Sequence, residues 1–322
     1  MRRLGARPAD SSGMALLITL MIMVILAALV HRFTFTTRVH LASAATLRDQ
    51  FQAECLATSG AEIALALLAE DDTPEVDHQG EPWALFRGSL GVEALQFPDG
   101  AFAVLVQDEN GKININQIVR QDGATVDPFV HAQVDRLLAL FQVQADRRDA
   151  LLDCLEDWLD ADDLHKLNGV ENEYYRGLDP PYTARNGPLR SLGELNLVKG
   201  WGEVLDLRLK DGTGITDYLT VSPTDGKINI NTAPLLVLQA LSPEIDEVIA
   251  GQIVSLRQEA PLAGPQLLPE MFRKRGVRDR IRFNSSLFSV RSEGLYRRVY
   301  SVVEIQAKRD ANEIRIVGRR ME

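Results

Sequence analysis

The sequence predicts an α+β protein, in which a long N-terminal helix packs on an antiparallel sheet and a helical region lies between the strands. Three patterns support this prediction. An apolar run near the N-terminus continues into an amphipathic helical pattern, strand patterns flank a helical middle region, and the string GKININ occurs at 111–116 and again at 226–231. With 322 residues, of which 45% are hydrophobic, the chain can bury a substantial core.

The N-terminal apolar run predicts a membrane-spanning helix. Residues 14–30 read MALLITLMIMVILAALV, with no charge and Thr19 as the one polar side chain. Seventeen helical residues span about 25 Å, near the lower limit for crossing a bilayer. Arg2, Arg3 and Arg7 precede the run, and basic residues favour the cytoplasmic side. We therefore expect a single-pass protein whose body lies on the opposite side of the membrane.

The same helix is expected to continue well beyond the membrane. Apolar and small side chains follow at helical steps of three and four, namely Ala44, Leu47, Phe51, Cys55, Ser59, Ile63 and Leu67. Asp71, Asp72 and Pro74 then end the pattern. A secretory signal peptide is a weaker alternative, because its small-residue cleavage motif at 42–44 lies far past the run. A plain uncleaved anchor is the other alternative.

Strand patterns occur on both sides of the helical region, at 83–87, 101–107 and in three C-terminal segments: 288–292, 300–308 and 313–317. The Asn110-Gly111 pair predicts a hairpin, so that the first GKININ string would return antiparallel to 101–107. The second copy would return in the same way against 218–221. Asn116, and Asn231 or Thr232, are the expected caps of the helices that follow.

GKININ is predicted to be a structural joint, since none of its side chains is a good nucleophile or base at neutral pH. The continuation ININTAP raises an alternative, because it resembles helix-hairpin-helix modules of DNA-binding proteins. The matching hairpin, 241–246, has no glycine and carries two acids, and the chain has a formal net charge of −10. A membrane-anchored DNA-binding or DNA-uptake protein is the second hypothesis. The missing glycine and the acidic charge argue against it, so nucleic acid is not an expected partner.

An acidic loop at 156–175 is the densest group of potential metal ligands. Its candidate ligands are Asp157, Asp160, Asp162, Asp163, Glu171 and Glu173. Oxygen ligands without cysteine suit calcium, although the spacing is not that of an EF-hand, and a solvated acidic loop is the alternative. No serine–histidine or cysteine–histidine pattern suggests an enzyme. Cys55 and Cys154 are expected to be buried, unreactive thiols, and the sequence leaves open whether they pair.

Four strings carry a family resemblance: DWLDADD, NGVENEYY, LDPPY and NGPLRSLGELNLVKGW. Together with the two KININ joints they closely resemble the protein K family, the large minor pseudopilins of type II secretion. The resemblance implies a pseudopilin fold with a large inserted helical domain that binds calcium in some members. It implies a leader at 1–13 and an N-terminal helix at 14–70, of which 14–30 would span the membrane. The first sheet segment would follow at 80–116 and the C-terminal strands at 281–322. Between them, the inserted domain at 117–280 would contain two helix-hairpin-helix-like or SAM-like subdomains.

The resemblance also implies how the N-terminus is processed. Prepilin peptidase would cut between Gly13 and Met14 and methylate the new N-terminus at Met14. Most pseudopilins carry glutamate at the fifth mature position, whereas this chain has Ile18. That carboxylate is thought to pair with the N-terminal amine of a neighbouring subunit, so its absence suits a subunit with no neighbour above it.

The function implied is structural and non-catalytic. The protein would lie at the tip of the pseudopilus with minor pseudopilins I and J, contact other pseudopilus subunits, and help to initiate assembly for export across the outer membrane. It would be anchored in the inner membrane of a Gram-negative bacterium, with a cytoplasmic N-terminus and a periplasmic body.

Overall fold

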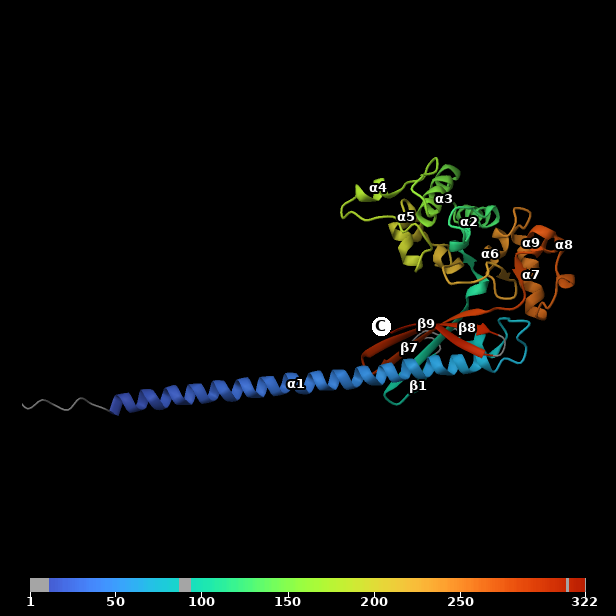
Figure 1. Ribbon diagram of the computed structural model, residues 1–322. Coiled ribbons are helices and arrows are strands. Elements are labelled where there is room, and N and C mark those ends of the chain that lie inside the picture. Colours follow the sequence, from blue (N-terminus) through green and yellow to red (C-terminus); the bar gives the residue numbers. More distant parts are fainter. Residues whose placement is uncertain (1–11, 87–93, 311–312, 322) are drawn as a thin grey trace, which may run out of the picture.

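The computed structural model describes residues 12–86, 94–310 and 313–321, and it begins with a very long helix, α1 (Ser12–Ala69). Figure 1 shows α1 projecting far beyond the rest of the protein on its N-terminal side. Within the described residues, α1 is the one helix long and apolar enough to cross a membrane. The predicted leader, including Arg2, Arg3 and Arg7, lies almost wholly outside the described residues.

A five-stranded antiparallel sheet lies against the C-terminal half of α1. Its strand order is β1-β2-β7-β8-β9. The strands are β1 (Leu95–Phe97), β2 (Gly100–Asp108), β7 (Leu287–Tyr296), β8 (Val299–Asp310) and β9 (Glu313–Met321). The chain leaves the sheet after β2 and returns at β7, so the helical domain is inserted between two neighbouring strands, as the sequence predicts.

Small side chains let α1 approach the sheet closely. Ala57, Ala61 and Ala64 are fully buried against Phe102 and other apolar side chains of β2, β7 and β8. A Cβ atom on Gly294 of β7 would lie 2.2 Å from the Ala53 carbonyl oxygen. Because a side chain there would push the helix off the sheet, this glycine fixes the helix–sheet distance.

One predicted strand is wrong. The segment expected at 83–87 instead begins as a 3-10 helix, η1 (Pro82–Leu85), which Pro82 starts and which buries Trp83 against Phe288. Proline supplies the φ of a first helical turn and cannot donate to a strand ladder. Arg87, and the predicted turn residues Ala311 and Asn312, lie outside the described residues.

The inserted domain is built from short helices around one apolar core. Its α-helices are α2 (Pro128–Leu140), α3 (Ala145–Leu159), α4 (Asn172–Arg176), α5 (Trp201–Leu205), α6 (Leu235–Ala240), α7 (Glu247–Glu259), α8 (Glu270–Arg273) and α9 (Arg275–Arg278). Its 3-10 helices are η2 (Glu109–Gly111), η3 (Ile115–Ile118), η4 (Leu192–Leu197), η5 (Ile215–Tyr218) and η6 (Pro265–Leu267). In Figure 1 this domain and α1 lie on opposite sides of the sheet.

The two GKININ strings form joints, but not hairpins. In the first, β3 (Ile113–Asn114) pairs in parallel with β4 (Leu219–Thr220). In the second, β5 (Ile228–Asn229) pairs in parallel with β6 (Ile281–Arg282). The predicted antiparallel returns are therefore wrong. In the first copy, the Asp108 carboxylate accepts a hydrogen bond from Asn110 N and turns the chain into η2, which directs the next strand away from β2.

The last asparagines of the two joints make equivalent hydrogen bonds. Asn116 exchanges hydrogen bonds with the backbone N and O of Leu189, and Asn231 does the same with Leu262. The prediction that Asn116, and Asn231 or Thr232, would cap the next helices is therefore wrong. Asp127 caps α2, and α6 begins after Pro234. The structural interpretation of the repeat is confirmed: each copy fastens the start of a helical unit to a distant later segment.

Candidate metal centre

Three carboxylates of the acidic loop converge where α3 ends and α4 begins. Asp160 follows the last residue of α3, and Glu171 is the N-cap residue of α4. One carboxylate oxygen from each of Asp160, Asp162 and Glu171 lies within 4.8 Å of the other two. The two helix ends thus bring ligands that are eleven residues apart in sequence to one point.

Several oxygens at this point lack hydrogen-bond donors, although Asp162 Oδ1 accepts from Leu164 N at 2.8 Å. Asp160 and Glu171 are buried, with 8% and 6% of their surface exposed. Asp160 Oδ1, both carboxylate oxygens of Glu171 and Asn186 Oδ1 have no hydrogen-bond partner in the described part of the chain. Asn186 lies against the same loop, since its Nδ2 donates to the Asp162 carbonyl at 2.9 Å. Buried oxygens without partners are costly, so this arrangement is typical of a cation-binding site.

The electrostatics agree with this geometry. Burial, together with the charges of Asp157 and Asp160, raises the pKa of Glu171 to about 7. Burial also raises the pKa of Asp160 to about 6, with Asp162 and Asp157 as further causes. Each carboxylate therefore resists ionisation in the presence of the others, and a bound cation would relieve that repulsion.

Asp157 holds the loop in shape. Both of its carboxylate oxygens accept from Lys166 N at 3.1 Å, and burial raises its pKa to about 6. Gly169 packs directly against it, because a Cβ at this position would lie 1.9 Å from Asp157 Oδ2. Asp153 contributes in the same way by accepting from both nitrogens of Asn168. These contacts fix the backbone that carries the converging carboxylates.

Three of the predicted ligands lie outside the convergence: Asp157, whose oxygens accept from Lys166 N, and the two described next. Asp163 accepts a hydrogen bond from Asn172 Nδ2 at 2.7 Å. Glu173 is exposed on α4 and belongs to no convergent group. Asn186 was missed, because nothing in the sequence links an asparagine to a loop that ends more than ten residues earlier. Glu156 was missed as well: it is buried and bridges His131 Nδ1 and Lys166 Nζ at 2.5 and 3.2 Å.

The residues present fit a calcium ion. The available ligands are oxygens only, they come from carboxylates and an amide, and Asp160 Oδ1 and both Glu171 carboxylate oxygens lack a donor in the described residues. Calcium takes six to eight such oxygens in flexible geometry, and water can complete the set. The same oxygens without nitrogen or sulfur do not suit zinc. Asp160, Asp162 and Glu171 would hold the ion, with Asn186 as a further oxygen donor.

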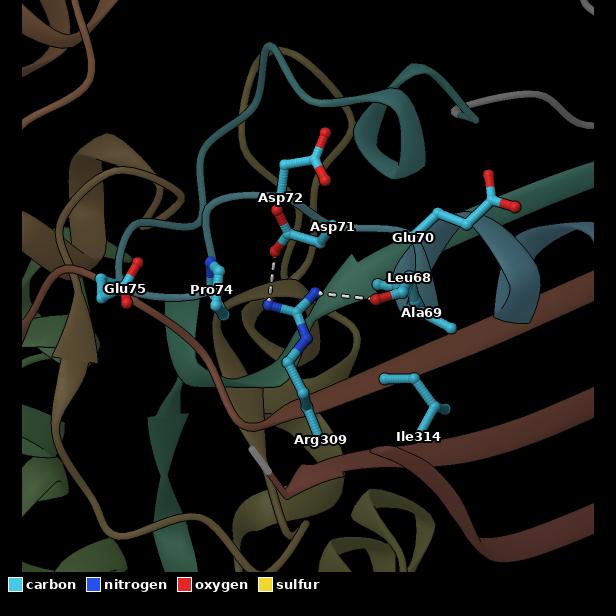
Figure 2. A pocket seen from close by; sticks show the side chains of 9 residues that line it. All are labelled: Leu68, Ala69, Glu70, Asp71, Asp72, Pro74, Glu75, Arg309 and Ile314. Carbon is cyan, nitrogen blue, oxygen red and sulfur yellow. Dashed lines mark hydrogen bonds and ion pairs between the residues drawn. The ribbon is translucent and has the colours of Figure 1, made fainter. Parts of the chain in front are cut away.

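A second group of carboxylates has a different character. Asp71, Asp77 and Glu81 also bring oxygens within 4.8 Å of one another. Here Arg309 supplies the cation: its Nη1 lies 2.9 Å from Asp71 Oδ2 and 2.5 Å from Asp77 Oδ1. Figure 2 shows Arg309 between Asp71 and the Leu68 carbonyl at the base of an open hollow of about 770 Å³. This group is a buried ion-pair network.

The remaining predicted features lie elsewhere. Gly13 and Met14 are exposed at the start of α1, and Ile18 is 54% exposed. Cys154 is buried, and burial raises its pKa to about 11, as expected of an unreactive thiol. Cys55 is exposed, which corrects the prediction for it, and both thiols are free. In the segment 241–246, Asp246 caps α7 by accepting from Ile249 N, so this acid has a structural role.

The comparisons with known proteins agree with one another. Sequence models of the family "Type II secretion system (T2SS), protein K" match residues 111–211 and 228–291. Type II secretion system protein K of Pseudomonas aeruginosa is 30% identical over 255 residues, which cover 76% of this chain and 72% of the relative. The Klebsiella pneumoniae protein K is 29% identical, over 76% of this chain and 74% of that protein.

The fold has a counterpart of known structure. The chain resembles a chain in the crystal structure of the GspK-GspI-GspJ complex from enterotoxigenic Escherichia coli, with a TM-score of 0.62 and 20% sequence identity. The match covers 89% of this chain and 99% of the other. At this identity the likeness establishes a shared fold.

Proposed function

Because this chain belongs to the type II secretion system protein K family, we propose that it forms the tip of the pseudopilus, as a structural and non-catalytic minor pseudopilin that helps to initiate assembly. The observation that carries this proposal is the contrast along α1. Its C-terminal half packs on the sheet, whereas residues 13–48 are exposed and largely apolar. An exposed apolar helix of this length needs a bilayer and then the helices of neighbouring subunits.

The position at the tip is supported by the shape of the protein. The helical domain lies at the end of the molecule far from the N-terminus of α1 (Figure 1). In a filament that grows from the membrane, this bulk would obstruct any subunit added beyond it. The first turns of α1 carry Ile18, which offers no carboxylate to the N-terminal amine of a subunit above, yet can pack against helices below.

We infer that prepilin peptidase cuts between Gly13 and Met14, which leaves an N-methylated Met14 in the inner membrane and the body in the periplasm. The decisive measurement is the mass and first residue of the protein from its native membrane. A chain that begins at methylated Met14 supports the proposal, whereas one that begins at Met1 or near Thr46 contradicts it. In Gly13→Val the uncut chain should accumulate, and among the described residues no atom lies within 4 Å of the added Cβ to disturb folding.

The partners we propose are minor pseudopilins I and J, because the structural relative was crystallised in a GspK-GspI-GspJ complex. Co-expressed with tagged I and J subunits, the full chain should co-purify with them. An otherwise folded chain that never associates with either subunit would contradict the tip assignment, while correct processing at Met14 would still place the protein among the pseudopilins.

We further propose that the acidic loop binds calcium through Asp160, Asp162 and Glu171. The support is the convergence of buried oxygens without donors. Calorimetric titration of the full chain in detergent should detect calcium binding that is lost in Glu171→Gln. Glu173→Gln is the matched control, because Glu173 lies only two residues away but outside the convergence. Equal binding by the two variants would contradict the assignment.

A further inference from the structure

The last strand of the sheet, β9, has one edge without a partner. It pairs with β8 on one side, and within the described residues no strand or other backbone group pairs with its opposite side. β9 is nine residues long and contains no proline. Such an edge presents backbone donors and acceptors in a row, and an extended segment of another chain can satisfy them as an added strand.

Helix α1 leaves this strand partly uncovered. The register of the ladder places Ile316 opposite Ala307 and Met321 opposite Val303. Ala307 and Val303 are buried in the core between α1 and the sheet, so Ile316 and Met321 point to the same face. Both nevertheless remain exposed, at 47% and 46%. An added strand would bury these two apolar side chains alongside the helix.

The surroundings of this edge are acidic where β9 begins. Ile314 lines the hollow beside Arg309, as Figure 2 shows. Glu70, Asp72 and Glu75 line the same hollow; they are exposed, and none of them makes an ion pair in the part of the chain that the structure describes. Arg309 does not balance them, because it already pairs with two other carboxylates. A lysine or arginine beside Ile314 on an added strand would therefore meet three unpaired carboxylates.

The other end of the edge carries the opposite charge. Arg319 lies opposite Ile305, which is buried against α1, so Arg319 also points to this face. It is exposed and forms no ion pair with any described residue. The β8 partners of Ile314 and Arg319 are Arg309 and Ile305, which are four residues apart. The charge of the edge therefore changes sign over about 13 Å, the length of four extended residues.

We propose that the free edge of β9 binds an extended segment of a partner protein as an antiparallel sixth strand. At every second position, this segment would carry an acid beside Arg319, then an apolar residue beside Ile316, then a lysine or arginine beside Ile314. The antiparallel direction follows from the sheet, in which every pair of strands is antiparallel, the more stable arrangement per residue.

The charges of β9 favour such a partner over a second copy of this chain. The strand contains three arginines and a single acid, Glu313. Two copies of β9 side by side would bring like charges together across the new ladder, which destabilises strand pairing. A strand with one acid and one base at the stated positions has the complementary charges at both ends.

The test measures binding of a fluorescein-labelled peptide, Val-Thr-Glu-Thr-Val-Thr-Lys, to the full chain in detergent by fluorescence anisotropy. The peptide has no net charge, and its glutamate and lysine are four residues apart. Arg319→Glu should lower the affinity by about tenfold, because an attractive pair becomes repulsive. A second peptide, with lysine in place of the glutamate, should bind Arg319→Glu more tightly than it binds the natural chain.

The matched control is Arg320→Glu. Arg320 is the next residue of β9 and pairs with Glu304, so it points to the opposite face of the sheet. The same change of charge should therefore lower the affinity for the first peptide by less than about threefold. Equal losses in Arg319→Glu and Arg320→Glu, or no reversal with the second peptide, would overturn the proposal.

Backbone methylation tests whether the peptide binds as a strand. In an added strand only alternate N–H groups face β9, so methylation of one alternate set of peptide nitrogens should abolish binding and methylation of the other set should preserve it. Equal results for the two sets would overturn the proposal. So would dimers of the full chain that the peptide dissociates, because the occupant would then be a second copy. Arg319→Glu should still be processed at Met14, so failure of this proposal is distinguishable from failure of the pseudopilin assignment.

Discussion

Two clusters of three carboxylates in the described residues differ in what balances their negative charge. Around Asp77, which is fully buried, Arg309 supplies a permanent internal cation. Glu171 is also buried, and in the described chain neither its two carboxylate oxygens nor Asp160 Oδ1 has a hydrogen-bond donor or an arginine or lysine partner. The chemistry of the acids is the same, so the counter-ion decides whether the cluster is fixed or responds to its surroundings.

The difference follows the location of each cluster. Asp77 connects three parts of the protein: its carboxylate accepts from Ser285 N and pairs with Arg309 of β8, and its carbonyl accepts from Asn229 Nδ2 of the second joint. A permanent ion pair suits a junction that must never open. The acidic loop lies at an edge of the inserted domain, where a cation from solution can enter and order the chain locally.

The largest effect should come from Arg309→Met. It leaves Asp71 and Asp77 buried without their cation, which should lower the free energy of unfolding by about 3 to 5 kcal/mol in urea titrations at pH 8. The control is Arg315→Met on β9, whose ion pair with Asp310 is exposed and should contribute less than about 1 kcal/mol.

The same variant sharpens the comparison. Without Arg309, the Asp77 cluster resembles the acidic loop, so calcium should recover part of the lost stability of Arg309→Met. Burial raises the pKa of Asp77 to about 6, so the loss should be smaller at pH 5, where this carboxyl is mostly protonated. A loss below 1 kcal/mol at pH 8 would mean that the junction does not depend on its internal cation.

A smaller effect of opposite sign is expected in the acidic loop. In calcium-free buffer at pH 8, Asp160→Asn with Glu171→Gln removes two repelling buried charges and should stabilise the protein by on the order of 2 kcal/mol. The double variant should then show no change in Tm on addition of calcium. A destabilised variant in the absence of calcium would show that these carboxylates have donors and that the comparison fails.

The pH dependence of the calcium effect follows from the same pKa values. Folding raises the pKa of Glu171 from 4.5 to about 7 and that of Asp160 from 3.8 to about 6. Unfolding therefore releases protons between about pH 4 and pH 7, and the metal-free protein loses stability as the pH rises through this window. Calcium should raise the Tm by several degrees more at pH 8 than at pH 5, as measured by differential scanning calorimetry. An equal shift at both pH values would contradict it.

The comparison also shows where sequence reasoning succeeds. The helix near 14–70 and the strands at 288–317 were predictable, because their periodicities are long and local. The acidic loop was recognisable as a dense group of acids, because its members are close in sequence. The choice among its six acids was not: Asp157 binds the backbone of Lys166 and Asp163 binds Asn172, and both contacts depend on the fold of the loop.

Contacts over long sequence separations were beyond reach. Arg309 meets Asp77 across 232 positions, and no pattern in the sequence pairs them. The predicted strand pairing of the two GKININ joints was wrong for the same reason, since Ile113 pairs with Leu219 and Ile228 with Ile281, both far away in sequence. The local Asn-Gly signal favours a hairpin, but the buried Asp108 carboxylate overrides it through donors from distant segments, Thr232 and Ser285.

The smallest expected change, at Asn186, tests the comparison most directly. Its Oδ1 is buried without a donor beside the loop, and its backbone has a φ of 47°, which asparagine tolerates well. Asn186→Lys would supply an internal cation like Arg309. The gain in charge balance opposes the backbone strain, so stability without calcium should change by less than about 1 kcal/mol, while calcium binding is abolished.

The converse substitution, Asn186→Asp, adds a carboxylate without changing the size of the side chain. Calcium affinity should rise, and the metal-free protein should become slightly less stable, since a further negative charge joins the cluster. Titration calorimetry of the two variants gives opposite expected results from one position. If both bind calcium as the natural chain does, Asn186 does not face the ion, and the ion would be held by Asp160, Asp162, Glu171 and water alone.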